Sequence, residues 1–437
     1  EAFADYGAEN VESTFRSCYA GEEEHGSVRL PRSAGGKGRR EADEANKPAE
    51  VEAIEAFLFS QAEFRHNVIT HHCEIRWTEE AGFLPLTDRD VNTLWGRMNK
   101  TVGRVYLTDI YNVIHSEFVP LFNPFQSYFD HLPSWDGVSD PIGDLADTVH
   151  VKSDQAEFRD YFRKWFVGIL PALLDDTVVN HEILVLIGEQ GLYKTTWFNF
   201  LLPPELRCYF YTKTNSDRLN KDDLFSLTEF ALICFEELDG MRPAELNQLK
   251  AMVTMPYVNE RAAYGRNKER HPHIASFCGT GNNVQFLTDP TGNRRWLPFE
   301  VSQIRDPHQH AIPYELVYSQ AYALWKSGFC HWFSQEEIRV LNTHNSRFEV
   351  PNLEEDLIRT HFRKPFEGEA GIFVTAADIL EQISSCLRYP LSPNKIGRIM
   401  AGLEFESIRY KGKRGYITVK KTGEDIDRER RSGALGL

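Results

Sequence analysis

The sequence predicts an α/β fold in which a central sheet is flanked by helices. Three short apolar runs, 183–187, 230–235 and 274–278, can each be a buried strand, and each is followed by polar residues. The stretch 156–174 is strongly amphipathic, as a helix packed on such a sheet would be. In α/β sheets, ligands bind at the carboxyl ends of the strands, so the polar residues after each run are the candidate site.

Composition allows two or three domains and a large core. The chain has 437 residues, of which 41% are hydrophobic. No apolar run approaches the ~20 residues that a membrane-spanning helix needs. The seven cysteines are scattered without a CxxC pair, which favours a reducing cytoplasm and argues against a structural zinc site. The net charge of −15 does not exclude nucleic acid, because a local patch can be positive while the whole is acidic.

The stretch 181–196, HEILVLIGEQGLYKTT, has the layout of a phosphate-binding P-loop: strand, glycine-bearing turn, Lys-Thr and helix. In such a loop backbone N–H groups wrap the phosphates, Lys194 binds the terminal ones and the hydroxyl of Thr195 binds Mg²⁺. Tyr193 stands where the usual pattern has glycine, and tyrosine tolerates a positive φ poorly. An ordinary strand–turn–helix junction is the alternative. The candidate nucleotide-binding residues are Gly188, Gly191, Tyr193, Lys194, Thr195 and Thr196.

The next two strands end in residues that fit catalysis. FALICF is followed by Glu236 and Glu237, a Walker B layout in which the first acid holds the metal and the second orients and deprotonates water. The usual pair is Asp-Glu, so the longer Glu236 shifts the metal contact. After the third strand, Asn282 can position the lytic water. Arg294 and Arg295 in GNRRW are candidates for an arginine finger, although such a pair is also a common surface feature.

Two basic regions are candidates for DNA contact. Tyr264, Arg266 and Lys268 combine an aromatic ring with cations, which is how many proteins bind single strands, but a solvent-exposed hairpin explains them equally well. Near the carboxyl terminus, short helices over 354–361, 376–383 and 393–403 precede the basic hairpin ESIRYKGKRGYITVKK. This is the winged-helix pattern. A winged helix that contacts protein rather than DNA is the alternative. Its candidate DNA contacts are Lys413 and Arg414.

The composition divides the chain into five parts. We expect a disordered linker over 1–50, a mainly helical domain over 51–150, a P-loop ATPase domain over 151–345, a winged-helix-like domain over 346–421 and a disordered tail over 422–437. The chain does not begin with methionine, so we expect that an upstream part is missing. Within the second part the expected helices are 51–60, 87–99 and 107–115, and the expected strand is 66–77.

The order of these motifs resembles the virulence-associated protein E family. The Lys-Thr loop, the acidic strand end, the YGR segment, the GTGN strand end and GNRRW follow one another as in that family. NPFQSYFDHLPSWDG, residues 123–137, is similar to the stretch that precedes its ATPase, and the likeness covers roughly 51–325. The family consists of AAA+-like P-loop ATPases related to superfamily three helicases and to the primase-helicases of phages and poxviruses.

The resemblance implies a cytoplasmic, hexameric, ATP-driven motor on DNA, a helicase or translocase encoded on a mobile element or prophage. ATP and Mg²⁺ would bind between subunits of a ring, with single-stranded DNA in a central channel. The missing upstream part would hold a primase-like or related domain. The alternatives are a regulatory or defence ATPase that assembles without unwinding, and a non-catalytic DNA-binding scaffold. By this resemblance, Lys194 and Thr195 bind the nucleotide phosphates and Mg²⁺, Glu236 binds the metal and Glu237 activates the water. Asn282 is the sensor, and Arg294 or Arg295 is the arginine finger that a neighbouring subunit supplies.

Overall fold

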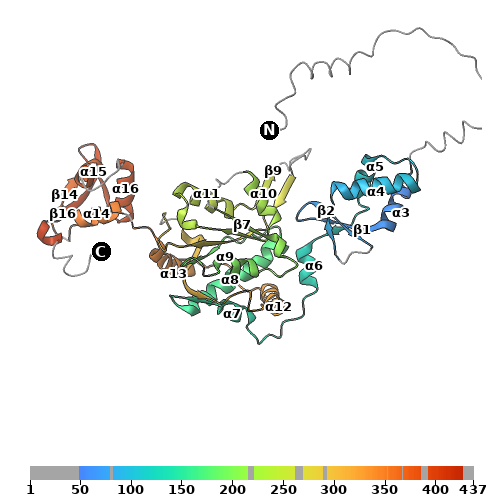
Figure 1. Ribbon diagram of the computed structural model, residues 1–437. Helices are drawn as coiled ribbons and strands as arrows, with labels where there is room; N and C mark the ends of the chain where they lie inside the picture. Colours follow the sequence, from blue (N-terminus) through green and yellow to red (C-terminus); the bar gives the residue numbers. More distant parts are fainter. Residues whose placement is uncertain are drawn as a thin grey trace, which may run out of the picture. The chain divides into compact units, whose positions relative to one another are not determined.

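The computed structural model describes residues 49–78, 82–214, 221–260, 269–288, 293–351, 353–366, 368–384 and 392–426 (Figure 1). Several expectations concern other residues and lie outside this range: the linker up to residue 48, the DNA contacts Tyr264, Arg266 and Lys268, and the tail from residue 427. The described chain divides into two compact units. The first holds residues up to His66 and His72–Leu121, and the second holds Asn67–His71 and everything from Phe122.

The first unit combines helices with a small sheet of strand order β3-β2-β1-β4. Its helices confirm the expected ones, but the expected single strand over 66–77 is wrong, because the chain reverses at residues 68–71, which are counted with the second unit. The side chain of Asn67 accepts hydrogen bonds from the N–H groups of Ile69 (3.0 Å) and Thr70 (3.2 Å), which stabilises the turn. The elements are α3 (Val51–Gln61), β1 (Ala62–Asn67), β2 (His72–Trp77), β3 (Leu84–Pro85), α4 (Asp88–Thr101), α5 (Leu107–Ile114) and β4 (Leu121–Phe122).

The second unit is built on a six-stranded sheet of order β5-β12-β6-β11-β8-β7. Its strands are parallel except β5, which pairs antiparallel with β12. Every residue of β6, β8 and β11 is buried, as expected for parallel strands covered on both faces. The strands are β5 (Val149–Val151), β6 (Ile183–Ile187), β7 (Phe210–Lys213), β8 (Leu232–Phe235), β11 (Ser276–Gly281) and β12 (Trp296–Ile304).

Helices cover both faces of this sheet. Alternate residues of β6 point to opposite faces: Leu184 and Leu186 join one apolar cluster, and Ile183, Val185 and Ile187 join another. The first cluster contains α8 and α12 and the second contains α11 (Figure 1). The helices are α6 (Pro124–Asp130), α7 (Pro141–Ala146), α8 (Gln155–Leu174), α9 (Lys194–Phe200), α10 (Lys221–Glu229), α11 (Pro243–Val253), α12 (Tyr314–Lys326) and α13 (Gln335–Asn345).

Shorter elements complete this part of the chain. The strands β9 and β10 pair antiparallel, and the 3-10 turns connect strands and helices. None of the described helices is long and apolar enough to cross a membrane. The shorter elements are β9 (Tyr257–Glu260), β10 (Glu269–Pro272), η1 (Arg207–Tyr209), η2 (Leu238–Gly240), η3 (Asn293–Arg295) and η4 (Ser346–Phe348).

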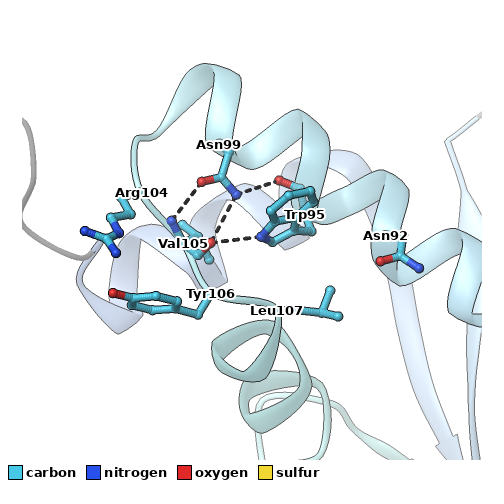
Figure 2. Close-up of a pocket in the computed structure, with 7 residues that line it drawn as sticks. All are labelled: Asn92, Trp95, Asn99, Arg104, Val105, Tyr106 and Leu107. Carbon is cyan, nitrogen blue, oxygen red and sulfur yellow. Dashed lines mark hydrogen bonds between the residues drawn. The ribbon is translucent and has the colours of Figure 1, made fainter. Parts of the chain in front are cut away.

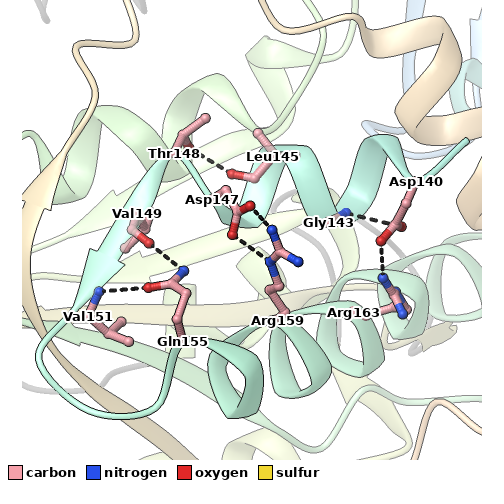
Figure 3. Close-up of polar contacts among 10 residues, drawn as sticks. All are labelled: Asp140, Gly143, Leu145, Asp147, Thr148, Val149, Val151, Gln155, Arg159 and Arg163. Carbon is pink, nitrogen blue, oxygen red and sulfur yellow. Dashed lines mark hydrogen bonds and ion pairs between the residues drawn. The ribbon is translucent and has the colours of Figure 1, made fainter.

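Polar contacts fasten the edge strand β5 to α8 (Figure 3). The side-chain amide of Gln155 donates to the carbonyl of Val149 (2.9 Å) and accepts from the N–H of Val151 (3.1 Å). One turn further along α8, the guanidinium of Arg159 forms an ion pair with Asp147. Because α8 also packs against α6 and α7, the boundary between the units falls before α6, whereas the sequence placed a boundary between residues 150 and 151, inside β5.

The carboxyl-terminal part has its own apolar core, formed by its helices and strands. The three helices and the hairpin expected there are present. The turn of the hairpin is Lys411–Gly412 alone, with φ of 47° and 80°, as in a two-residue turn, so Lys413 and Arg414 belong to a strand. Residues 423–426 form a helical turn in which the N–H of Ile426 donates to the carbonyl of Thr422 (3.1 Å), so the expected disordered tail over 422–437 is wrong for its first residues. The elements are α14 (Leu353–His361), β13 (Phe362–Arg363), β14 (Ile372–Val374), α15 (Ala376–Ser384), α16 (Pro393–Gly402), β15 (Ser407–Tyr410) and β16 (Lys413–Lys420).

Candidate functional site

The candidate site lies at the carboxyl edge of the six-stranded sheet. Strand β11 is parallel to both of its neighbours, with Gly281 opposite Ile187 of β6 and Gly279 opposite Phe235 of β8. The carboxyl ends of the three strands therefore meet at one edge. The residues that follow them are the loop from Gly188, the acid Glu236 and the amide Asn282.

Hydrogen bonds join these three strand ends through the first residues of α9. The ammonium group of Lys194 donates to the carbonyls of Gly188 (2.7 Å) and Glu189 (2.8 Å) and to Oδ1 of Asn282 (3.3 Å). The hydroxyl of Thr195 donates to Oε1 of Glu236 (2.8 Å). An amine, a hydroxyl, a carboxylate and an amide are thus collected around one point. Thr196 follows in the same turn of α9 and is half-buried.

A third acid, Asp239, belongs to this site and was missed by the sequence reasoning. Its Oδ1 accepts from the N–H of Asn282 (3.2 Å) and its Oδ2 from the N–H of Asn283 (3.1 Å), so it holds the end of β11. Burial lowers the pKa of the Lys194 ammonium, and the charge of Asp239 raises it. The signal was present in the sequence as the last acid of EELD, but only the fold brings it close to Lys194.

The loop between β6 and α9 needs its glycines for two different reasons. A side chain at Gly188 would place a Cβ 2.9 Å from the carbonyl oxygen of Val301, which is too close. Gly191 has φ +89°, a conformation that L side chains rarely adopt. Tyr193 (φ 58°) and Glu237 (φ 54°) are left-handed without being glycine, at a cost of roughly 1–2 kcal/mol each. The poor fit expected of tyrosine in this loop is therefore present as backbone strain.

The arginines Arg294 and Arg295 lie at the opposite edge of the sheet. They immediately precede β12, whose first residue, Trp296, pairs with Ile183, the first residue of β6. Since β12 and β6 are parallel, both arginines are at the amino edge, and the length of β6 separates them from Lys194 by roughly 15 Å. Within one chain the structure does not bring them to the candidate site.

At the amino edge the arginines lie near His181 and Glu182, which precede β6. Burial raises the pKa of Glu182 to about 7, and the charges of Lys164 and Arg294 oppose that rise. The pKa of Arg295 is lowered by burial and by the charge of Arg294, and raised by Glu182. Arg294 is exposed, whereas Arg295 is partly buried.

The donor set at the carboxyl edge fits magnesium bound together with a triphosphate. Magnesium usually takes one or two carboxylates and fills its remaining positions with phosphate oxygens and water. Glu236 and the hydroxyl of Thr195 supply suitable oxygens. No group of three or more His, Cys, Asp or Glu side chains that could hold a metal by itself occurs in the part of the chain that the structure describes.

The basic hairpin of the carboxyl-terminal part forms a separate candidate surface. Arg409 of β15 is directly opposite Arg414 of β16, and Tyr410 is opposite Lys413. All four side chains are exposed, and Nε of Arg414 donates to Oγ of Ser407 (2.8 Å). Like charges directly opposite each other across a hairpin are destabilising, so this strand pair is arranged at some cost to stability.

Comparison with known proteins places the chain in a family. The virulence-associated protein E-like domain matches residues 130–350, which is about half of the chain and lies wholly in the second unit. No curated protein matches. Among solved structures, the apo structure of NrS-1 C terminal region (305-718) is similar with 12% identity and a TM-score of 0.44, over 85% of this chain and 99% of that one.

A second structure, the A form apo structure of NrS-1 C terminal region-CTR(305-718), has 12% identity and a TM-score of 0.43 over the same shares of the two chains. The family assignment rests on the domain match, which spans α7, the whole six-stranded sheet and the carboxyl-edge residues from Gly188 to Asn282. The chain belongs to the virulence-associated protein E-like family, the one that the order of its motifs resembled.

Proposed function

We propose that this protein is an ATP-dependent DNA helicase or translocase of a mobile element or prophage, and that it hydrolyses ATP at the carboxyl edge of its six-stranded sheet. One observation carries the proposal: Lys194 contacts Asn282 while the adjacent Thr195 contacts Glu236, so three strand ends present polar groups to one place. This is the convergence that a P-loop ATPase needs. Membership of the family supports the same function.

Each side chain has a role that its position supports. The ammonium of Lys194 would exchange its bonds to the carbonyls of Gly188 and Glu189 for bonds to phosphate oxygens. Thr195 and Glu236 would hold Mg²⁺, which when bound would neutralise charge on the phosphates. Glu237, the residue after Glu236, would orient and deprotonate the attacking water, and Asn282, which contacts Lys194, would act as the sensor.

The arginines require a second copy of the chain. Because Arg294 and Arg295 lie at the edge away from Lys194, they can act on the triphosphate only from a neighbouring subunit. Such an arrangement follows if subunits form a ring, each presenting its amino edge to the carboxyl edge of the next. We propose a hexameric ring with ATP at each interface.

DNA would be bound in two places. The segment with Tyr264, Arg266 and Lys268 would bind a single strand in the channel of the ring. The neighbouring strands already combine an aromatic ring with a cation, since the guanidinium of Arg270 lies 3.7 Å from the ring centroid of Tyr257. The carboxyl-terminal part would act as a winged helix whose Lys413 and Arg414 bind phosphates, which would also relieve the repulsion between the facing arginines of the hairpin.

The test is ATP turnover by the purified chain, with and without single-stranded DNA. Lys194→Ala and Glu237→Gln should each abolish most of the turnover, because one removes a phosphate ligand and the other the base. Lys326→Ala, which changes an exposed lysine on α12, is the matched control and should leave turnover unchanged. If both site variants turn over ATP at the wild-type rate, the assignment of the site is wrong.

The strain at Tyr193 favours one alternative in particular. A non-glycine residue held at φ 58° departs from the usual phosphate-binding loop, so slow turnover is expected, as for a regulatory or defence ATPase that assembles without unwinding. A forked DNA substrate separates the two: hydrolysis without strand separation supports the regulatory ATPase. If neither occurs and Lys413→Glu with Arg414→Glu still abolishes DNA binding, the protein is a DNA-binding scaffold.

A further inference from the structure

The first unit contains a pocket that the proposed ATPase does not use. It has a volume of about 360 Å³ and lies between α4 and the segment that leads into α5 (Figure 2). That size is at the lower end of the range for small-ligand pockets, roughly 300–1,000 Å³. Trp95 and Asn92 line it from α4, and Arg104, Tyr106 and Leu107 line it from the segment.

The walls of the pocket are fixed by hydrogen bonds rather than by loose packing. Nε1 of Trp95 donates to the carbonyl of Val105 (2.9 Å). The amide of Asn99 donates to the carbonyls of Val105 (3.1 Å) and Trp95 (3.0 Å), and its oxygen accepts from the N–H of Val105 (3.1 Å). The indole ring and the segment before α5 therefore hold their relative positions, as Figure 2 shows. A pre-organised site loses less entropy when it binds a ligand.

The exposed groups of the pocket have the chemistry that binds a nucleobase. Trp95 and Tyr106 leave 41% and 45% of their surfaces exposed, so both present apolar surface to solvent. The guanidinium of Arg104 lies 5.1 Å from the ring centroid of Tyr106, on the same rim. Aromatic rings beside a cation bind successive bases by stacking while the cation binds the phosphate. Asn92 adds a side-chain amide with both donors and an acceptor for the edge of a base.

We propose that this pocket binds one base of a single-stranded nucleic acid, stacked on Trp95 and Tyr106, with the adjoining phosphate on Arg104. An apolar peptide is the less suitable ligand, since the polar groups of Arg104 and Asn92 occupy two sides of the pocket. The inference rests on the proposed function in that DNA is the substrate. It adds a contact outside the ATPase sheet and outside the carboxyl-terminal hairpin.

The experiment measures the affinity of the full chain for a fluorescein-labelled oligothymidylate, by anisotropy and without ATP. Trp95→Ala and Tyr106→Ala should each weaken binding about five- to 150-fold, because each removes a stacking surface. Trp95→Phe should keep most of the affinity. Arg104→Ala should make the slope of log affinity against log salt concentration shallower by about one, the change expected when one phosphate contact is lost. Phe59→Ala is the matched control, since Phe59 is an aromatic residue of the same unit, 81% exposed on α3, and lies outside the pocket.

A cross-link to the wild-type chain keeps the test valid if Trp95→Ala fails to fold after losing its bond to Val105. An oligonucleotide that carries 5-iodouracil should cross-link to Trp95 or Tyr106 on irradiation, as mapped by mass spectrometry. Wild-type affinity in Tyr106→Ala, or cross-links that map only elsewhere, would overturn the proposal.

Failure of this proposal and failure of the ATPase proposal give different results. Lys194→Ala should bind the oligonucleotide like wild type, because the pocket is not part of the ATPase site. If Lys194→Ala loses ATP turnover but Tyr106→Ala binds the oligonucleotide like wild type, only the proposal for the pocket is wrong. If Tyr106→Ala weakens oligonucleotide binding but Lys194→Ala turns over ATP like wild type, only the proposal for the ATPase site is wrong.

Discussion

The two edges of the six-stranded sheet carry different chemistry. At the carboxyl edge, Lys194 is hydrogen-bonded to Asn282, and the adjacent Thr195 is hydrogen-bonded to Glu236. At the amino edge, Arg294 and its neighbour Arg295 lie near the half-buried Glu182 and make none of those contacts. One edge is assembled as a site within a single chain, and the other is not.

The difference follows from the directions of the strands. Parallel strands place all of their carboxyl ends together, so residues that follow β6, β8 and β11 meet without help from another chain. Residues that precede a strand are at the far edge, the length of the sheet away. An arginine there can reach a triphosphate only across an interface between copies. The carboxyl edge therefore supplies the groups proposed to bind the nucleotide, and we propose that the arginines come from the amino edge of a neighbouring subunit.

The largest expected effect is at the amino edge. Arg294→Ala should lower ATP turnover by about 10³ or more, the range for an arginine that acts in trans. We expect a smaller loss from Arg295→Ala, because Arg295 is partly buried whereas Arg294 is exposed. Steady-state phosphate release measures both.

Mixing two inactive proteins sharpens this prediction. In an equal mixture of Lys194→Ala and Arg294→Ala chains, about a quarter of the interfaces of a closed ring pair two intact halves. Turnover should therefore recover well above that of either protein alone. A mixture whose turnover equals the average of its components would show that the arginine does not act across an interface.

The next effect tests the carboxyl edge. Glu236→Gln should lower the maximal rate by about 100-fold or more, since it weakens the proposed ligand of a magnesium ion whose charge stabilisation would be worth several kcal/mol. Asp239→Asn should instead raise the KM for ATP by about tenfold, because it removes a charge that favours the ammonium form of Lys194. Glu336→Gln, an exposed acid on α13, is the control. If Glu236→Gln, Asp239→Asn and the control all changed KM and the maximal rate equally, Glu236 and Asp239 would not have the separate roles of metal ligand and positioning residue.

A smaller effect concerns stability at the amino edge. The pKa of Glu182 is about 7 in the folded chain against an ordinary value of 4.5. Between pH 4.5 and about pH 7, Glu182 is therefore protonated in the folded chain and ionised in the unfolded chain. Stability is therefore complete below about pH 4.5 and falls as the pH rises through about 7. The difference between the two pKa values corresponds to about 3 kcal/mol, of which solvent around the half-buried Glu182 screens a part. Glu182→Gln removes this loss and should gain about 1–2 kcal/mol relative to wild type between acid and mildly alkaline solution.

Thermal unfolding of the two proteins across that pH range measures the difference. Glu406→Gln, which changes an exposed acid in the carboxyl-terminal part, should show no such trend. A constant difference between Glu182→Gln and wild type at every pH would mean that Glu182 is not the group that titrates.

The smallest effect tests the backbone strain in the loop between β6 and α9. Tyr193→Gly relieves a left-handed conformation worth roughly 1–2 kcal/mol and loses part of that gain to the greater freedom of glycine when unfolded. We expect a net gain of at most about 1 kcal/mol in the free energy of unfolding, with tighter ATP binding. Tyr193→Ala lacks the ring but keeps the strain, so it should show neither gain. If Tyr193→Gly and Tyr193→Ala were equally stable, the change in stability would come from loss of the tyrosine ring and not from relief of backbone strain.

Much of the candidate site was predictable from the sequence. Lys194 and Thr195 follow a β-branched run and a turn with two glycines, and Glu236 follows another apolar run, so their positions at strand ends depend on local pattern. The turn at 68–71 was missed although alternation of polar and apolar residues breaks there, at Val68-Ile69 and at Thr70-His71, because these residues include neither glycine nor proline, the usual markers of a turn. Asp239 was missed because its contact with the end of β11 joins residues more than forty positions apart.

The sequence by itself determined the strands β6, β8 and β11 and the helix α8, because apolar periodicity and glycine turns are local properties of a chain. It also placed the chain in its family, through the order of its motifs. It did not predict the other three strands of the sheet, β5, β7 and β12. Only the tertiary structure decided which strands are neighbours, and so which polar groups share an edge. Strand order and register depend on contacts between distant residues, and they are what puts Asn282 beside Lys194 and Arg294 far from it.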